Sequence, residues 1–171
     1  MILLVQPGGW YTRSSIATLV IHRRPRVILI GLGSNLPHPE IGDSASVLRE
    51  ALVRLHAKDV KILRVSPFIA TEPVPVSDQP WYQNAVCAVE SALSASDLLA
   101  VLHEIEADFG RVRGVRNAAR ILDLDLLIYH HERDPVGPPI LPHPRMFERD
   151  FVMVPLATIA DAEALRAEFD A

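Results

Sequence analysis

The pattern of apolar and polar positions along the chain predicts four β-strands. Residues 27–32 form a short apolar run ahead of a Gly-Ser-Asn turn sequence, which is typical of a buried strand. Residues 61–69 and 82–90 alternate well enough to be strands, and Pro67 should place the far end of the first at a sheet edge. A fourth strand, residues 120–128, carries two aspartates among leucines and isoleucines.

Three segments show helical patterns. Residues 44–56 have the apolar spacing of an amphipathic helix, and residues 150–159 also look helical. Ser94-Ala-Ser-Asp97 has the form of a capping box, with Asp in place of Glu. Gly110 suits the C-terminal end of the helix that follows it. One stripe of that helix comprises Leu98, Leu102, Ile105 and Phe109.

The order of elements from Val27 onward is β-α-β-β-α-β with an extra C-terminal helix. This is the ferredoxin-like order, an α+β fold in which helices cover one face of an antiparallel sheet. The 171 residues, 49% of them hydrophobic, fit a single domain, which we place at residues 26–171. Residues 1–25 lack the features of a signal peptide, and we expect a poorly ordered extension or a start codon placed too early.

Composition narrows the function classes. A net charge of −4 argues against a general nucleic-acid binder, so we expect no nucleic-acid partner. The apolar runs are too short to span a bilayer, so we expect no membrane partner. Cys87 is the single cysteine, in an apolar run, which fits a buried thiol in a reducing compartment. We therefore expect a cytoplasmic protein.

Asp123 and Asp125 are the strongest chemical signal. Residues i and i+2 of a strand face the same way, so their Cα atoms should lie roughly 6.5 Å apart. Two like charges side by side are unfavourable unless something positive lies between them. A divalent cation that prefers oxygen ligands would do this, and Mg²⁺ is the first candidate. Pairing of each aspartate with an arginine explains the pattern equally well.

The basic residues point to an anionic ligand. Apart from Lys58 and Lys61, all Lys and Arg positions are arginine, whose forked donors suit phosphate oxygens. Such a cluster is more often a solvated loop, but this one lies between a helix end and the acidic strand. A ligand with several phosphates and Mg²⁺ would need both signs of charge in one place. The cluster comprises Arg111, Arg113, Arg116 and Arg120.

Two further groups could bind a flat polar ring. Tyr82 and Asn84 form another i, i+2 pair, offering a ring for stacking and an amide for hydrogen bonds. A surface tyrosine with a solvated amide is the plainer interpretation. His143 lies between two prolines, and Arg149 and Phe151 follow closely enough to join the same cleft.

Together these segments resemble one family, the 6-hydroxymethyl-7,8-dihydropterin pyrophosphokinases of folate biosynthesis. They occur in the family's order, cover about residues 27 to 160, and agree with the family's ferredoxin-like fold. The matching segments are Gly33-Ser-Asn-Leu36, Thr71 through Asp78-Gln-Pro-Trp-Tyr-Gln-Asn84, Gly110-Arg-Val-Arg113, Arg120-Ile-Leu-Asp-Leu-Asp125, and Pro142-His-Pro144 through Arg149-Asp-Phe-Val-Met-Val-Pro-Leu156.

The resemblance implies transfer of a pyrophosphoryl group from ATP to 6-hydroxymethyl-7,8-dihydropterin, with release of AMP. We expect the protein to be a monomer. It implies that Asp123 and Asp125 hold two Mg²⁺ ions and act in catalysis together with Arg111 and Arg120. The implied ATP-binding residues are Glu106, Arg113, Arg120, His143 and Arg149. The implied pterin-binding residues are Thr71, Val74, Tyr82, Asn84 and Phe151.

Two departures from the family pattern bear on this hypothesis. Asn117-Ala-Ala119 stands where relatives often have Trp and then Gly-Pro, and Pro138 stands where some have an arginine. One alternative is a ferredoxin-like module that holds RNA or a nucleotide through its arginine loop without chemistry, and the acidic pI argues against it. A second alternative is a catalytically inactive relative kept as an interaction partner, which the Asn-Ala-Ala change favours.

Overall fold

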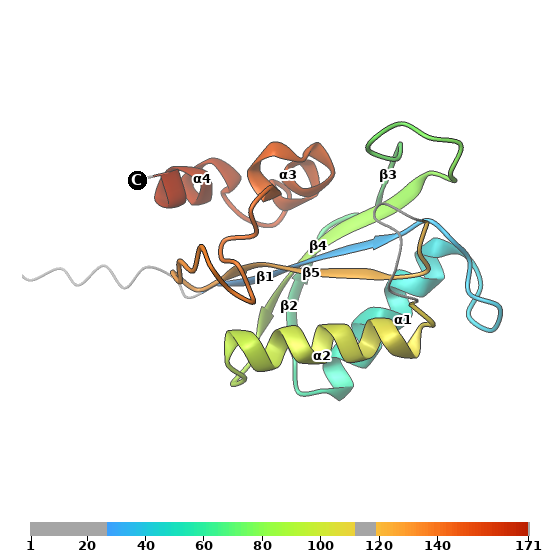
Figure 1. Ribbon diagram of the computed structural model, residues 1–171, viewed down its shortest axis with the longest axis horizontal. Helices are drawn as coiled ribbons and strands as arrows, with labels where there is room; N and C mark the ends of the chain where they lie inside the picture. The colour runs from blue at the N-terminus through green and yellow to red at the C-terminus, as the bar shows by residue number, and fades with distance from the viewer. Residues whose placement is uncertain (1–26, 112–118, 171) are drawn as a thin grey trace, which may run out of the picture.

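The computed structural model describes residues 27–111 and 119–170. In that part of the chain one antiparallel sheet of five strands forms the centre, with order β2-β4-β1-β5 and with β3 also paired to β4 (Figure 1). The strands are β1 (Ile28–Ser34), β2 (Lys61–Val65), β3 (Ile69–Thr71), β4 (Tyr82–Glu90) and β5 (Asp123–Tyr129). The α+β class predicted from the pattern is confirmed.

Helices lie on both sides of the sheet. The helices α1 (Ser44–Ala57) and α2 (Ala95–Asp108) cover one face, and α3 (Asp150–Leu156) and α4 (Ala162–Asp170) lie on the other (Figure 1). The helix predicted at residues 150–159 ends at Leu156, and α4 was not predicted. The N-terminal end of β5, which carries Asp123 and Asp125, lines a cavity together with Arg149 and Phe151.

The leucines and aspartates of β5 divide between the two faces as the pattern predicted. Leu122, Leu124 and Leu126 are at most 3% exposed and belong to the core beneath α1 and α2. Leu127 belongs instead to the core on the α3 side. Leu29 of β1 pairs with Ile128 and Ile30 pairs with Leu126, which leaves Leu127 as the extra residue of a β-bulge.

The second helix begins and ends as its sequence predicts. The Ser94 side chain accepts a hydrogen bond from the backbone N–H of Asp97, so it is the N-cap of α2. Its apolar stripe is buried, with Leu102 fully inaccessible to solvent. Gly110 follows the helix with φ of +79°, in the left-handed region that favours glycine.

Three predicted strand boundaries were wrong. The predicted strand at residues 61–69 ends at Val65 and β3 begins only at Ile69, because Pro67 lacks an N–H and cannot continue the ladder. The preceding Ser66 hydroxyl accepts a hydrogen bond from the Val86 N–H at 3.0 Å. The first strand extends to Ser34 because Gly33 and Ser34 still pair with β4, and β5 begins at Asp123 rather than at residue 120.

The stability of the fold should depend on the packing of α2 against the sheet. We expect Leu102→Ala to lower the free energy of unfolding by about 3 kcal/mol, because the substitution leaves a cavity in a fully buried core. Val53→Ala on the outer face of α1, where the side chain is 61% exposed, should change it by less than about 0.5 kcal/mol. Urea denaturation of both variants measures this, and equal losses would contradict the assignment of the core.

Candidate active site

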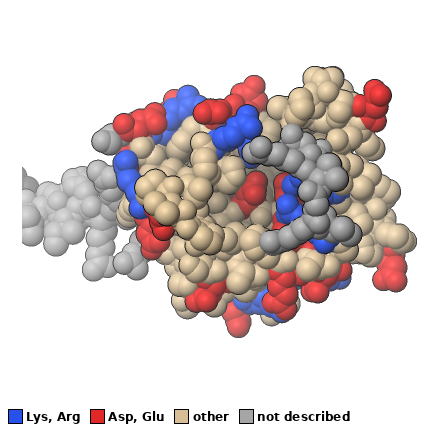
Figure 2. Space-filling view, in the orientation of Figure 1, with Lys and Arg blue, Asp and Glu red and all other residues tan. Residues whose placement is uncertain are grey.

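A cavity of about 310 Å³ opens where β1 ends and the antiparallel strands β4 and β5 begin, beside the loop that follows β3. Figure 2 shows acidic and basic side chains together in a hollow on this face of the molecule. The lining comes from segments far apart in sequence. It comprises Gly33, Thr71, Glu72, Pro73, Val74, Pro75, Ser77, Gln79, Tyr82, Asn84, Arg111, Arg120, Asp123, Asp125, His143, Arg149 and Phe151.

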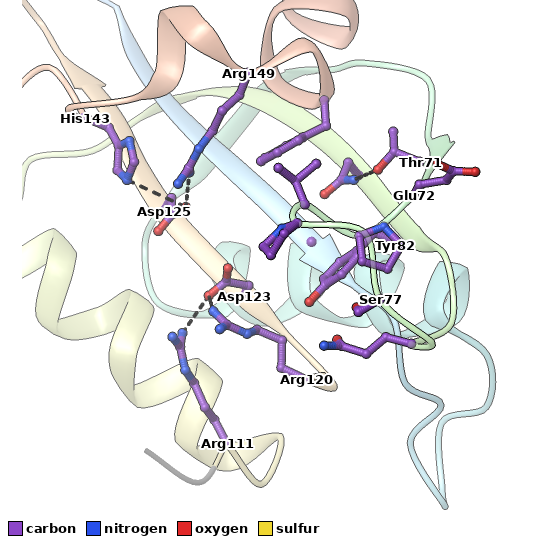
Figure 3. Close-up of a pocket in the computed structure, with 17 residues that line it drawn as sticks. Thr71, Glu72, Ser77, Tyr82, Arg111, Arg120, Asp123, Asp125, His143 and Arg149 are labelled. Atoms are coloured by element: carbon purple, nitrogen blue, oxygen red, sulfur yellow. Dashed lines mark hydrogen bonds and ion pairs between the residues drawn. The ribbon is translucent and has the colours of Figure 1, made fainter. Parts of the chain in front are cut away.

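Asp123 is the centre of an ion-pair cluster. Its Oδ1 lies 2.8 Å from Nη1 of Arg111 and 2.8 Å from Nη1 of Arg120 (Figure 3). The side chain of Asp123 is nevertheless 26% exposed and lies in the cavity wall. Both interpretations of the acidic strand therefore describe part of the site: arginines pair with this carboxylate, and the carboxylate still faces an open pocket.

Asp125 has only longer contacts with cationic groups. Its Oδ2 lies 3.9 Å from Nε2 of His143 and 3.8 Å from Nη1 of Arg149 (Figure 3). Burial, followed by the charge of Asp123, raises the pKa of Asp125 above its ordinary value. Burial also lowers the pKa of His143, although Asp125 opposes that change. The charge of Asp125 is thus neutralised less completely by nearby cationic groups than the charge of Asp123.

Glu106 lies behind the cavity wall rather than in it. The residue is 1% exposed, and its Oε1 accepts hydrogen bonds from the backbone N–H of Leu124, at 2.8 Å, and from Arg111. Burial raises the pKa of Glu106 to about 7, against the opposing effects of these two donors. Glu106 therefore reaches the cavity through Arg111, and its predicted part in ATP binding stays a prediction.

The opposite side of the cavity is aromatic and amide-bearing. Asn84 is 7% exposed, and its Nδ2 donates to Oγ1 of Thr71 at 2.8 Å, which fixes the orientation of the amide. A Cβ at Gly33 would lie 3.1 Å from the Asn84 Oδ1, so a larger residue at this position would crowd that amide. The Phe151 ring lies under the guanidinium of Arg149, 5.4 Å from ring centroid to Cζ.

Sequence reasoning missed a buried link between the two sides. Asn35 is 2% exposed, and its Oδ1 accepts from the Arg120 backbone N–H at 2.8 Å. Its Nδ2 donates to the Gln79 side chain and to the Pro80 carbonyl, both at 3.2 Å. The only signal in the sequence was the asparagine of the Gly-Ser-Asn turn, whose partners lie 44 to 85 residues away.

Not every predicted residue can be placed. Arg113, Arg116 and the Asn117-Ala118 pair lie outside the described residues. Within residues 27–111 and 119–170, no three or more His, Cys, Asp or Glu side chains gather as metal ligands. Two carboxylates with open surroundings suit Mg²⁺, which commonly takes one or two carboxylates and completes its shell with water and phosphate oxygens. The donor set therefore fits the predicted ion.

No helix in residues 27–111 or 119–170 combines the length and the apolar character that crossing a bilayer requires.

The fold and the cavity together define a class of protein. An antiparallel α+β sheet presents paired carboxylates and arginines on one side of a pocket and a tyrosine with a fixed amide on the other, as expected of an enzyme that handles a phosphorylated ligand and a flat ring. Residues 29–161 match the family described as 7,8-dihydro-6-hydroxymethylpterin-pyrophosphokinase, and the chain belongs to that family.

Individual relatives agree with this membership. The 2-amino-4-hydroxy-6-hydroxymethyldihydropteridine pyrophosphokinase of Bacillus subtilis is 38% identical over 148 residues, which cover 84% of this chain and 86% of that protein. The Pseudomonas aeruginosa protein of the same name is 36% identical, over 78% of this chain and 80% of its own length. The mitochondrial folate synthesis bifunctional protein of Arabidopsis thaliana is 37% identical over 89% of this chain, which spans only 26% of that protein.

The pKa of Glu106 should make stability depend on pH. Because the folded value of about 7 lies above the ordinary 4.5, the stabilising contribution is complete below about pH 4.5 and is lost as pH rises through 7. At about 1.4 kcal/mol for each pKa unit, the loss is at most about 3 kcal/mol. Urea denaturation across pH 4.5 to 8 should show this loss in the wild type and not in Glu106→Gln. Parallel pH profiles would contradict it.

Proposed function

We propose that this chain transfers a pyrophosphoryl group from ATP to the hydroxymethyl oxygen of 6-hydroxymethyl-7,8-dihydropterin and releases AMP. The observation that carries the proposal is the meeting of the predicted residues in one cavity. All of those within the described residues, apart from Glu106, line it. Family membership and the names of the relatives support the same reaction.

On the phosphate side, the reaction asks the protein for position and for charge neutralisation. Bound at Asp123 and Asp125, two Mg²⁺ ions would neutralise the triphosphate and polarise the acceptor hydroxyl. Arg111 and Arg120 present several N–H donors from a planar fork, so each can contact a phosphate oxygen as well as Asp123. These arginines thereby orient the chain of phosphates toward the acidic strand.

His143 and Arg149 extend the phosphate side on the Asp125 flank. The imidazole of His143 and the guanidinium of Arg149 lie 3.9 and 3.8 Å from Asp125, beyond normal hydrogen-bonding distance, so both groups can still donate to an anion's oxygen. The pKa of His143 is lowered by its burial, so at neutral pH the ring is mainly a neutral hydrogen-bonding group. We assign these two residues to ATP.

The pterin side would recognise a flat heterocycle by its faces and its edge. Tyr82 and Phe151 offer aromatic surface for stacking, and the Asn84 amide, oriented by Thr71, can donate and accept along the ring edge. Val74 is 66% exposed on the loop after β3, where its backbone can reach the same ring. These assignments extend the proposal to Thr71, Val74, Tyr82, Asn84 and Phe151.

The finer structural assignments are part of the proposal as well. The sheet order β2-β4-β1-β5, antiparallel throughout and with β3 as an addition to the edge of β4, supports a ferredoxin-like arrangement. We further propose a monomer that acts in the cytoplasm and depends on Mg²⁺.

The decisive experiment is release of AMP from ATP in the presence of the pterin, with and without Mg²⁺. We expect AMP to form only when both Mg²⁺ and the pterin are present. Asp123→Asn and Asp125→Asn should each leave the fold nearly intact but lower turnover about 100-fold or more, because the metal ligands are lost. Chromatography of the nucleotides, with circular dichroism as the check on folding, measures both effects.

Asp59→Asn is the matched control for this experiment. Asp59 lies in the turn after α1, away from the cavity, with φ of +60°, which asparagine tolerates well. Its turnover should equal that of the wild type. Absence of AMP from the wild type would indicate a catalytically inactive relative, and full turnover in either site variant would remove the metal role.

Tyr82→Ala should weaken pterin binding and leave ATP binding almost unchanged. The ring lies on the pterin side of the cavity, and a lost aromatic contact of this kind is worth about 1–3 kcal/mol, or about 5- to 150-fold in affinity. Tyr82→Phe retains the ring and should bind the pterin nearly as well as the wild type. Fluorescence titration with each ligand measures this, and an equal loss for ATP would assign Tyr82 elsewhere.

A further inference from the structure

Glu106 makes two contacts that both lead to the acidic strand. Its Oε1 accepts from the backbone N–H of Leu124, the residue between Asp123 and Asp125, at 2.8 Å. The same oxygen pairs with Nη1 of Arg111, and that nitrogen lies 2.8 Å from Oδ1 of Asp123. One buried carboxylate thus holds the strand backbone and, through an arginine, one of the carboxylates that the strand carries.

The first contact stabilises an edge. The β5 strand is the last of the sheet order, so its outer backbone groups have no neighbouring strand among the described residues. Glu106 lies on α2, on the face of the sheet opposite the cavity. Its carboxylate accepts a hydrogen bond from one of these outer N–H groups, that of Leu124. Because Leu124 lies midway between the two aspartates, this bond joins the stretch of strand that carries them to α2.

The second contact fixes Arg111 at both ends. Its guanidinium pairs with the Glu106 carboxylate, and its backbone N–H donates to the Glu106 carbonyl at 3.1 Å. The Arg111 side chain is 26% exposed whereas the Glu106 side chain is 1% exposed, so the buried carboxylate anchors the planar guanidinium. Without that partner, the remaining ion pair of Arg111 within residues 27–111 and 119–170 would be the one with Asp123.

We propose that Glu106 is a positioning residue, which sets the placement of Arg111 and of the Asp123–Asp125 stretch without itself contacting a substrate. The inference rests on the proposed function and deepens it. It differs from a direct role in ATP binding, because the side chain does not line the cavity.

A purely structural carboxylate would behave differently. After the isosteric change Glu106→Gln, Arg111 is still 26% exposed and still has Asp123 as a counter-ion, so no buried charge is left unpaired and the protein should remain folded. Glutamine also retains an oxygen for the Leu124 N–H while losing the charge that holds Arg111. If Glu106 served the fold alone, Glu106→Gln would keep its turnover.

The test compares Glu106→Gln with Glu104→Gln, which removes one charge from the exposed face of the same helix, where Glu104 pairs with Lys58. We expect Glu106→Gln to lower kcat about 10- to 100-fold, the effect of a small misplacement of reacting groups, with KM for the pterin within about twofold. Glu104→Gln should match the wild type. Unchanged kcat in Glu106→Gln overturns the proposal.

A double-mutant cycle with Arg111→Gln separates positioning through Arg111 from an independent effect. The double variant should be no slower than Arg111→Gln alone, because Glu106 acts through that arginine. Additive losses of kcat overturn this part of the proposal, whereas circular dichroism shows whether any variant fails because it unfolds.

Hydrogen exchange tests the backbone contact without reference to activity. In Glu106→Leu the Leu124 amide loses its acceptor, and NMR should show its exchange at least about tenfold faster, with the amides of β1 unchanged. Unchanged exchange at Leu124 overturns the contact. If the wild type releases no AMP, the proposed function fails, and this measurement still decides whether Glu106 holds the strand.

Discussion

The structure of the site depends on two carboxylates that project from one edge strand into a pocket rimmed by guanidinium groups. Asp123 is satisfied by Arg111 and Arg120, whereas Asp125 keeps only contacts near 4 Å. The two carboxylates therefore have different electrostatic surroundings, although they lie only two residues apart on the same strand. A cation and a polyphosphate together would relieve both conditions, since each would bring the charge that the other side lacks.

The sheet makes this arrangement possible by keeping its two faces chemically separate. Leu124 and Leu126 of β5 pack beneath α1 and α2, and the two aspartates line the cavity on the opposite side. The bulge at Leu127 then returns apolar side chains to that same opposite side, where α3 covers them. On this face of the sheet, β5 therefore contributes polar residues to the cavity before the bulge and apolar residues to the core from the bulge onward.

The sequence pattern predicted those features that depend on residues only a few positions apart, such as strand alternation, a helix cap and a helix stripe. Alternation placed Asp123 and Asp125 on one face, and the Ser94 cap and the Leu102 stripe defined α2, because strand and helix periodicities are local properties. The burial of Glu106 and the hydrogen bonds of Asn35 were not predictable this way. Their partners come from other elements, and a single sequence does not show which distant segments meet. The resemblance to a family supplied the residue roles, which geometry alone would have left open.

The contact of Arg149 with the Phe151 ring joins the two halves of the cavity through one side chain, since the same guanidinium also faces Asp125. A ligand that immobilises Phe151 restricts the rotamers of Arg149, and this entropy is then not lost a second time when an anion binds. Thermodynamic linkage requires the effect to be mutual: whichever ligand enters first, the other gains affinity by the same factor. Cooperativity between unlike ligands can therefore arise here without any rearrangement of the backbone.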